Sequence, residues 1–299
     1  MKTHAAAIDQ VHQGAKPADF LALTKPRLNL LVLITTLAGI YLAAPQGVSL
    51  ALLLHTLFGT TFVAFGAAAL NQVWERETDG LMRRTASRPL PAGRIRAGDG
   101  AWFGIALSAI GLLQLGIAVN GLTAAVAFVT LASYVLVYTP MKRRSSLSTL
   151  VGAIPGALPP VIGWTAVTNE ITLPALVLFG IQFFWQMPHF LALAWIVRED
   201  YAAAGIPLLP TMEVDGRRTG HQTLLYTAVL WPVSLMPAVV GIAGAPYSVL
   251  ATGLGFAFIA LAALFAQQRT MTTARRLFFF SIVYLPLLWG ALVADRLWL

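Results

Sequence analysis

The stretch Asn71-Gln-Val-Trp-Glu75-Arg-Glu77-Thr-Asp79 follows directly on the apolar segment Leu50–Leu70 and holds three of the chain's 12 acidic residues. Asn71, Glu75 and Asp79 are spaced four apart, so in a helix they stack on one face. Amide and carboxyl oxygens gathered in this way suit a hard cation such as Mg²⁺, which often shares its oxygen ligands with a phosphate. The spacing therefore predicts a metal-binding face at the end of a membrane helix. The alternative is a solvated helix end whose acids pair with arginines one turn away.

Basic residues come next, at Arg83, Arg84 and Arg88. Guanidinium groups bind phosphate oxygens in a bidentate fashion. A metal held by the acids and a phosphate held by the arginines would then meet in one place. The pattern predicts a site for a phosphate-bearing substrate.

The composition is that of a membrane protein. Of the 299 residues, 58% are hydrophobic and only 11% are charged, whereas soluble domains carry about 25% charged residues. No long polar stretch remains for a second domain, so we expect one membrane domain over residues 25–299 behind a cytoplasmic tail, residues 1–24. The net charge of +8 is explained by membrane-flanking loops rather than by a nucleic-acid partner. The lack of cysteine excludes disulfides and thiolate metal sites.

A membrane-crossing helix needs about 20 mainly apolar residues. Nine segments meet this requirement, which predicts an all-α bundle of nine transmembrane helices. The expected segments are Leu28–Ala44, Leu50–Leu70, Ala101–Val119, Leu122–Tyr138, Leu150–Val167, Leu173–Val197, Thr223–Ile242, Ser248–Ala266 and Leu277–Leu297.

Lysine and arginine residues are divided unevenly between the two ends of these segments. With nine alternating crossings, 19 of the 20 fall on one side and only Arg296 falls on the other. Cytoplasmic loops carry the excess of such residues, so we expect the N-terminus in the cytoplasm and the C-terminus outside. The connections after the second and sixth helices are the longest and the richest in acid. Because long loops tend to be functional, we expect the active face to be cytoplasmic.

A second acidic stretch, Arg198-Glu-Asp-Tyr201, ends the sixth apolar segment. A bundle can bring this stretch opposite the first one across a cavity. Two facing acidic clusters can hold more than one Mg²⁺ and neutralise a diphosphate leaving group.

Several motifs of this chain occur together in one known family. They are Asn71-x-x-x-Glu75-x-x-x-Asp79 with Met82-x-Arg84-Thr85-x-x-Arg88-Pro89-Leu90-Pro91, then Tyr138-Thr139-Pro140-x-Lys142-Arg143-Arg144, Gly152–Trp164, Trp185–Phe190 and Arg198-Glu199-Asp200-Tyr201. The combination resembles the UbiA-like intramembrane prenyltransferases, and within them the members that farnesylate protoheme IX. The resemblance extends from about Lys25 to the last helix.

The resemblance implies transfer of a farnesyl group from farnesyl diphosphate to a vinyl group of protoheme IX, giving heme O, with Mg²⁺ as cofactor and heme as substrate. It implies metal ligation by Asn71, Glu75, Asp79, Glu199 and Asp200. It also implies catalytic roles for Asn71, Glu75, Asp79, Asp200 and Tyr201, and substrate contacts from Arg84, Arg88, Lys142, Arg143, Arg198, His189 and Trp185. An allylic cation needs π faces and a dry pocket, for which Trp74, Tyr138, Trp185 and Tyr201 are candidates.

The chain departs from the family pattern at two positions. Many members have Asp where this chain has Glu75, whose longer side chain still ligates Mg²⁺. The usual second motif has another aspartate, but Ile196 stands four residues before Asp200, which puts a second Mg²⁺ in doubt. For the heme, His189 can be an axial ligand of the iron or a hydrogen-bond partner of a propionate or of the backbone.

Two other functions compete with heme farnesylation. One is prenyl transfer to a quinone precursor or a chlorophyll-type ring by the same chemistry. The other is secondary transport of an anionic substrate, although transporters place ionisable residues near the bilayer midplane and here the charge lies at one end. The short N-terminus predicts a bacterial plasma membrane as the location, and the heme function would give a heme A synthase or a terminal oxidase as partner.

Overall fold

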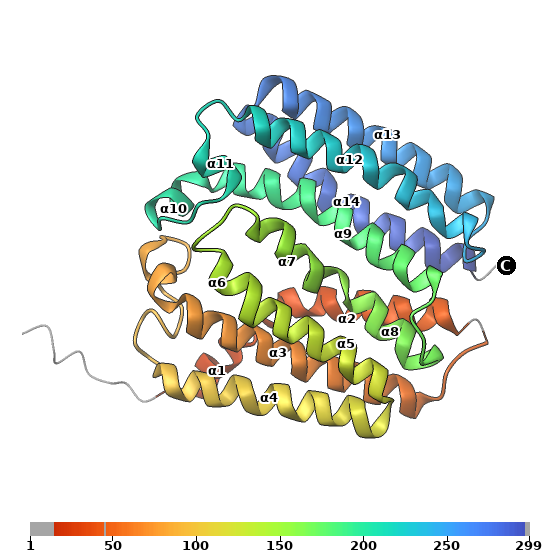
Figure 1. Cartoon of the computed structure of the whole chain (residues 1–299), viewed down its shortest axis with the longest axis horizontal. Helices are drawn as coiled ribbons and strands as arrows, with labels where there is room; N and C mark the ends of the chain where they lie inside the picture. The colour runs from red at the N-terminus through yellow and green to blue at the C-terminus, as the bar shows by residue number, and fades with distance from the viewer. Residues whose placement is uncertain (1–14, 45, 297–299) are drawn as a thin grey trace, which may run out of the picture.

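A computed structural model of the chain describes residues 15–44 and 46–296, and Figure 1 shows them as one bundle of long helices. The helices are α1 (Pro17–Leu23), α2 (Pro26–Ala43), α3 (Leu50–Leu81), α4 (Ala97–Ala118), α5 (Gly121–Ala132), the π-helix η1 (Ser133–Tyr138), α6 (Thr139–Met141), α7 (Ser148–Ala157), α8 (Pro159–Thr168), α9 (Leu173–Ile196), α10 (Arg198–Ala203), α11 (Leu209–Met212), α12 (Arg217–Val239), α13 (Ala245–Gln268) and α14 (Met271–Arg296).

Within the described residues, nine helical segments are long and apolar enough to cross a membrane. This confirms the predicted all-α bundle of nine spans. Two of the nine are composite, because α5, η1 and α6 together form the span Gly121–Met141, and α7 and α8 together form Ser148–Thr168.

Helix α3 is longer than the apolar pattern predicts. It runs for 32 residues, from Leu50 to Leu81, so it continues about three turns past Leu70. The polar side chains of this extension do not break a helix, and the first glycine after Leu70 is Gly80. The connection to α4 is consequently shorter than we expected, and the acidic stretch is helical.

Proline shapes the span made of α7 and α8. Pro159 has no N–H to donate, and it occupies the first position of α8, where a missing donor costs nothing. In the preceding span, the last turns before Thr139 are wound as a π-helix, a form that often marks functional sites. Both irregularities lie within membrane-spanning segments, where non-helical backbone is tolerated only if it is buried in protein or lines a water-filled cavity.

Small residues allow α3 and α4 to approach closely. A Cβ atom added to Gly66 would lie 2.6 Å from the carbonyl oxygen of Gly104, and one added to Gly104 would lie 3.1 Å from the carbonyl oxygen of Gly66. Close backbone approach of this kind replaces the hydrophobic driving force that is missing between helices in lipid. The packing fixes the axis of α3, and hence the position of its polar end.

The N-terminal part of the fold begins before residue 25. Helix α1 packs on the bundle, because Gln72 donates to the Leu23 carbonyl at 2.7 Å and Arg94 Nε lies 2.8 Å from Asp19 Oδ1. The Arg94 guanidinium lowers the pKa of Asp19 below its usual value. Residues 15–24, which we expected to be a tail, thus include a helix joined to α3 and to the α3–α4 connection. Residues 1–14 lie outside the described part of the chain.

Most of the short helices and connecting segments named below lie at one end of the bundle. Figure 1 shows the end of α3, the α3–α4 connection, α6, α10 and α11 at the same end. A small apolar cluster joins two of these segments, since Met82 after α3 packs with Ile206 and Leu208 between α10 and α11, and against Tyr201. The two acidic stretches therefore share one end of the bundle, as the sequence predicts.

Candidate functional site

The polar end of α3 turns one face into the protein. Asn71 is 2% exposed, Glu75 is 6% exposed and Asp79 is 1% exposed, whereas Trp74 between them is 50% exposed. The predicted stacking on one face is confirmed, and the alternative of a solvated helix end is wrong. Buried carboxylates are costly unless they are paired. Their partners therefore define the site.

Three cations from three segments contact this face. Lys142, just after α6, places Nζ 3.0 Å from Glu75 Oε1, and Arg88 of the α3–α4 connection places Nη1 2.6 Å from Asp79 Oδ2. Lys25, between α1 and α2, donates to Asn71 Oδ1 at 3.1 Å. Each oxygen-bearing side chain of the face is matched by one positive charge.

The π-helix holds the Asn71 amide in one orientation. The Thr139 hydroxyl donates to the Tyr134 carbonyl at 2.8 Å, five residues back, so its single hydrogen is used. The Thr139 oxygen can then only accept, and it accepts from Asn71 Nδ2 at 3.2 Å. Because Nδ2 faces Thr139, Oδ1 faces the cations. This assignment follows from the hydrogen-bond network.

The surroundings shift the pKa values of both lysines. Burial, together with the positive charge of Arg88, lowers the pKa of Lys25 to about 8. Burial acts in the same direction on Lys142, but Tyr138 and Glu75 outweigh it and raise the pKa of Lys142 above its usual value. Lys142 is consequently charged at neutral pH, while Lys25 is closer to losing its proton.

Tyrosine side chains of η1 and α10 lie at this end of the bundle. The rings of Tyr134 and Tyr138 stack with centroids 5.3 Å apart. Lys142 Nζ lies 5.8 Å from the centroid of the Tyr201 ring, which belongs to α10. Through Lys142, the second acidic stretch is connected to Glu75. Gly152 makes room for Tyr138, since a Cβ atom at that position would lie 2.6 Å from the ring.

The second acidic pair is placed differently from the first. Glu199 is exposed and Asp200 is half-buried. No hydrogen bond or ion pair of either side chain is present within residues 15–44 and 46–296, and no group of three His, Asp or Glu side chains gathers there as a metal cluster. The metal role of Glu199 and Asp200 stays a prediction.

The remaining basic residues of the prediction lie around the rim. Arg84 is exposed, and Arg143 lies 3.6 Å from Glu77 Oε2 on the outer face of α3. Arg198 stacks over the Trp195 ring at 4.3 Å. Of the basic residues that we predicted to contact substrate, Arg88 and Lys142 thus touch the buried acids.

His189 lies deeper in the bundle, on α9. Its ring stacks between Trp185 and Phe278, with centroid distances of 4.9 and 4.8 Å. Its Nδ1 atom lies 2.7 Å from the hydroxyl of Ser281, which donates its own hydrogen to the Phe278 carbonyl at 2.6 Å. Nδ1 must therefore donate, which leaves Nε2 with its lone pair free.

Some members of this site are not predicted from the sequence. From the sequence alone, Lys25 indicates only the membrane topology, and nothing distinguishes Thr139 and Ser281 from other polar residues in helices. Their partners are 46, 68 and 92 positions away in the chain. No local pattern signals such contacts.

Comparison with known proteins places the chain in a family. The model of the UbiA prenyltransferase family matches residues 32–283. The chain belongs to the UbiA prenyltransferase family. A protoheme IX farnesyltransferase of Solibacter usitatus is 47% identical over 93% of this chain and 98% of the relative. One of Myxococcus xanthus is 46% identical over 93% and 95%.

Solved structures of the family share the fold. A digeranylgeranylglyceryl phosphate synthase superposes with a TM-score of 0.82 at 18% identity, over 94% of this chain and 99% of the other. A UbiA homologue from Archaeoglobus fulgidus, solved with GPP and Mg²⁺, has a TM-score of 0.66 at 16% identity, over 92% and 99%. The family predicted from the motifs is confirmed.

Proposed function

We propose that the protein transfers the farnesyl group of farnesyl diphosphate to a vinyl group of protoheme IX. The carbon–oxygen bond to the diphosphate breaks, a carbon–carbon bond to the vinyl group forms, and water adds its hydroxyl to the resulting cation and releases a proton. The products are heme O and diphosphate. The observation that carries the proposal is the buried face of Asn71, Glu75 and Asp79 with its three cations, in a chain whose relatives are named protoheme IX farnesyltransferase.

The donor atoms of this face fit a magnesium ion. Asn71, Glu75 and Asp79 offer one amide and two carboxyl groups, which are hard oxygen donors, one helical turn apart. The Archaeoglobus homologue binds GPP together with Mg²⁺, which supports the same cofactor here. When bound, Mg²⁺ would supply positive charge for the diphosphate oxygens. Glu199 and Asp200, at the same end of the bundle, are the proposed ligands of a second ion.

The cations of the site stabilise the leaving group. Negative charge develops on the diphosphate as its bond to the farnesyl carbon breaks, and fixed positive charges placed there beforehand lower the barrier. Lys142 and Arg88 are held in place by Glu75 and Asp79. The rim arginines, Arg84, Arg143 and Arg198, would meet the outer phosphate oxygens.

The aromatic rings protect the allylic cation. The ring of Tyr201 faces Lys142, and π faces stabilise a carbocation without attacking it as a nucleophile would. Burial of the neighbouring α3 face keeps water from the cation until the vinyl carbon has reacted. Tyr201 is therefore the proposed catalytic aromatic residue.

His189 is the proposed contact of the heme. A propionate would need a hydrogen-bond donor, but Nδ1–H already donates to the Ser281 hydroxyl, and Nε2 is then an acceptor. A lone pair suits the iron, and a second-shell hydrogen bond to Nδ1 is the usual way in which proteins orient a ligating histidine. Ligation of iron is thus favoured over a propionate contact. Trp185 stacks on the imidazole and fixes its plane.

The setting in the cell follows from the same function. We propose that residues 25–299 act as one membrane domain in a bacterial plasma membrane, with the N-terminus and the active face in the cytoplasm. The distribution of 19 of the 20 lysine and arginine residues on one side supports this orientation. A heme A synthase or a terminal oxidase would receive the product.

An Asp79→Asn variant tests the proposed metal site. The amide keeps the shape of the side chain but loses the charge, so heme O formation is expected to cease while the helical content and the elution volume in detergent stay unchanged. Glu170→Gln is a matched control, because Glu170 is an exposed acid in the turn between α8 and α9. Wild-type yields of heme O from Asp79→Asn would overturn the metal assignment.

A further inference from the structure

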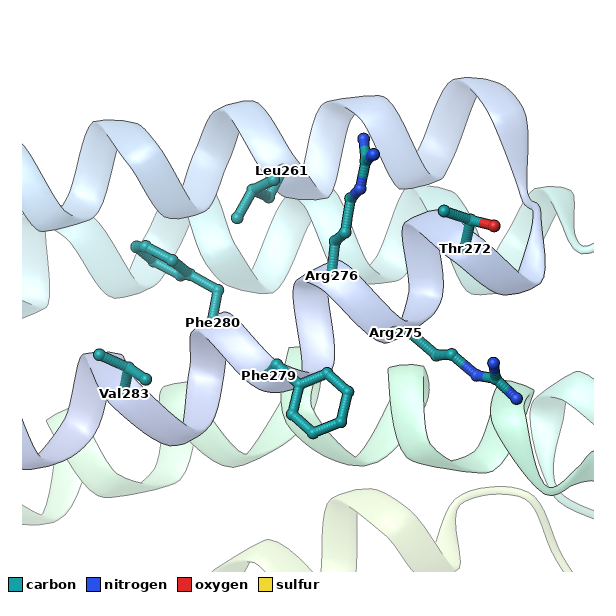
Figure 2. Close-up of a pocket in the computed structure, with 7 residues that line it drawn as sticks. All are labelled: Leu261, Thr272, Arg275, Arg276, Phe279, Phe280 and Val283. Atoms are coloured by element: carbon teal, nitrogen blue, oxygen red, sulfur yellow. The ribbon is translucent and has the colours of Figure 1, made fainter.

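An open groove of about 620 Å³ lies on the outer surface of α13 and α14, away from the buried acids of α3. Figure 2 shows the side chains that line it. The polar residues gather toward the N-terminal end of α14, and the apolar ones continue along the helices. The lining residues are Thr272, Arg275 and Arg276 at the polar end, then Phe279, Phe280, Val283 and Leu261.

The polar end of the groove carries positive charge that the protein does not neutralise. Arg275 and Arg276 are both exposed, and within residues 15–44 and 46–296 no carboxylate lies at ion-pairing distance from either. They also lie near the N-terminus of α14, where the helix dipole is positive and disfavours cations. Arg269 differs, because its guanidinium donates to the Ala266 carbonyl at 2.7 Å and caps α13. The pair is suited to an external anion.

The apolar part of the groove continues from this charge along one face of α14. Arg276, Phe280 and Val283 are spaced four and three residues apart, which places them in line over about 10 Å of helix. Phe279 is 63% exposed and Val283 is 53% exposed. An occupant therefore needs an anionic head and an apolar chain that lies along the helix.

We propose that this groove binds a phospholipid with an anionic headgroup. The phosphate contacts Arg276, whose guanidinium can bind it in a bidentate fashion, Arg275 adds positive charge at the same end of the groove, and an acyl chain lies on Phe280 and Val283. Basic residues at a membrane surface attract anionic lipids. A zwitterionic lipid also has a phosphate, but its ammonium group meets two guanidinium groups and no carboxylate. The groove is consequently selective for net negative charge.

The experiment uses the full-length protein in neutral detergent with added phosphatidylglycerol or phosphatidylcholine. Native mass spectrometry counts the lipids that stay bound, and titration gives their apparent affinity. The wild type is expected to retain phosphatidylglycerol in preference to phosphatidylcholine. An R275Q/R276Q variant is expected to bind phosphatidylglycerol about 30-fold more weakly, because each juxtamembrane arginine contributes a factor of about five.

The pair Arg217 and Arg218 provides a matched control. These two residues are also adjacent, exposed and close to a helix N-terminus, but they do not line the groove, and Arg217 Nε lies 3.9 Å from Asp215 Oδ2. R217Q/R218Q is expected to keep the lipid. A V283W variant leaves every charge in place and fills the path of the acyl chain, so it is expected to lose the lipid even if R275Q/R276Q does not fold.

Three results would overturn the proposal. The first is an equal loss of phosphatidylglycerol from both double-arginine variants, and the second is equal retention of the two lipids by the wild type. The third is displacement of bound phosphatidylglycerol by farnesyl diphosphate at equal concentration, which would assign the groove to the isoprenoid substrate. Lipid retention that depends on Arg275, Arg276 and Val283 supports it, whatever the outcome for heme O formation.

Discussion

A Thr139→Val substitution tests how the site orients Asn71. Valine keeps the shape of threonine at a position that is 3% exposed, but it removes the oxygen that accepts from Asn71 Nδ2 at 3.2 Å. The buried amide then lacks a partner, which costs about 1–3 kcal/mol. It is free to rotate and to present Nδ2 instead of Oδ1 to the metal. We expect this change to weaken the metal site without unfolding the bundle.

The expected loss of metal affinity follows from the position of Thr139 behind Asn71, a proposed metal ligand. Loss of an outer-shell partner typically lowers metal affinity by about 10- to 100-fold. The Mg²⁺ concentration for half-maximal heme O formation should rise by that factor in Thr139→Val, while kcat at saturating Mg²⁺ falls less. Binding of Mn²⁺, measured by electron paramagnetic resonance without substrate, should weaken in parallel.

Thr139→Ser is the control for this prediction. Serine keeps the hydroxyl, so it can accept from Asn71 and donate to the Tyr134 carbonyl as threonine does. It should restore both the Mg²⁺ dependence and the Mn²⁺ affinity. Unchanged metal binding in Thr139→Val would show that Thr139 does not orient Asn71. An equal defect in Thr139→Ser would assign the effect to packing of the π-helix.

Three further substitutions test other parts of the site and the fold. Lys142→Met leaves the buried Glu75 carboxylate without its cation and should lower the free energy of unfolding by about 3–5 kcal/mol, whereas adding Glu75→Gln should restore stability but not activity. Ser281→Ala removes the partner of His189 Nδ1 and should weaken heme binding, followed by Soret titration, by about 10- to 100-fold. Glu213→Ala removes the acceptor for two N–H groups at the start of α12 and should cost about 0.5–2 kcal/mol of stability.

Each of these has a result that contradicts it. A Lys142→Met variant as stable as the wild type would mean that Glu75 is not buried as a charged group. A Ser281→Ala variant with wild-type heme affinity would remove His189 from the heme site, and a shift in its Mg²⁺ dependence would point to general misfolding. Loss of heme O formation per folded molecule in Glu213→Ala would contradict a purely structural cap.

Much of the fold follows from the sequence because lipid imposes a simple rule. Apolar segments long enough to cross a bilayer must become helices, so the nine spans are predictable. Between α4 and α5, Asn120 caps α5 by accepting from the Thr123 N–H at 2.8 Å. The end of α3 does not follow from this rule, because the apolar run of the sequence ends at Leu70 although the helix continues to Leu81. The apolar composition therefore predicts which residues cross the membrane, but it does not predict where the helix ends.

The acidic face of the site was also predictable, since a spacing of four places Asn71, Glu75 and Asp79 together in any helix. The lysines that neutralise this face come from elsewhere in the chain. Lys142 is 67 positions from Glu75 and Lys25 is 46 positions from Asn71. The π-helix that aligns Thr139 with Asn71 has no distinct sequence signal. Tertiary packing decides these contacts, and only the structure supplies them.

Analysis of the reaction products tests heme farnesylation directly. Purified protein in detergent receives Mg²⁺, farnesyl diphosphate and reduced protoheme IX, and the porphyrins are then identified by mass spectrometry. We expect a farnesylated and hydrated heme that forms only when Mg²⁺ is present. Unmodified heme together with a prenylated aromatic acid, such as 4-hydroxybenzoate, would contradict the proposed acceptor. No transfer to any acceptor by a folded, Mg²⁺-binding protein would contradict the enzyme itself.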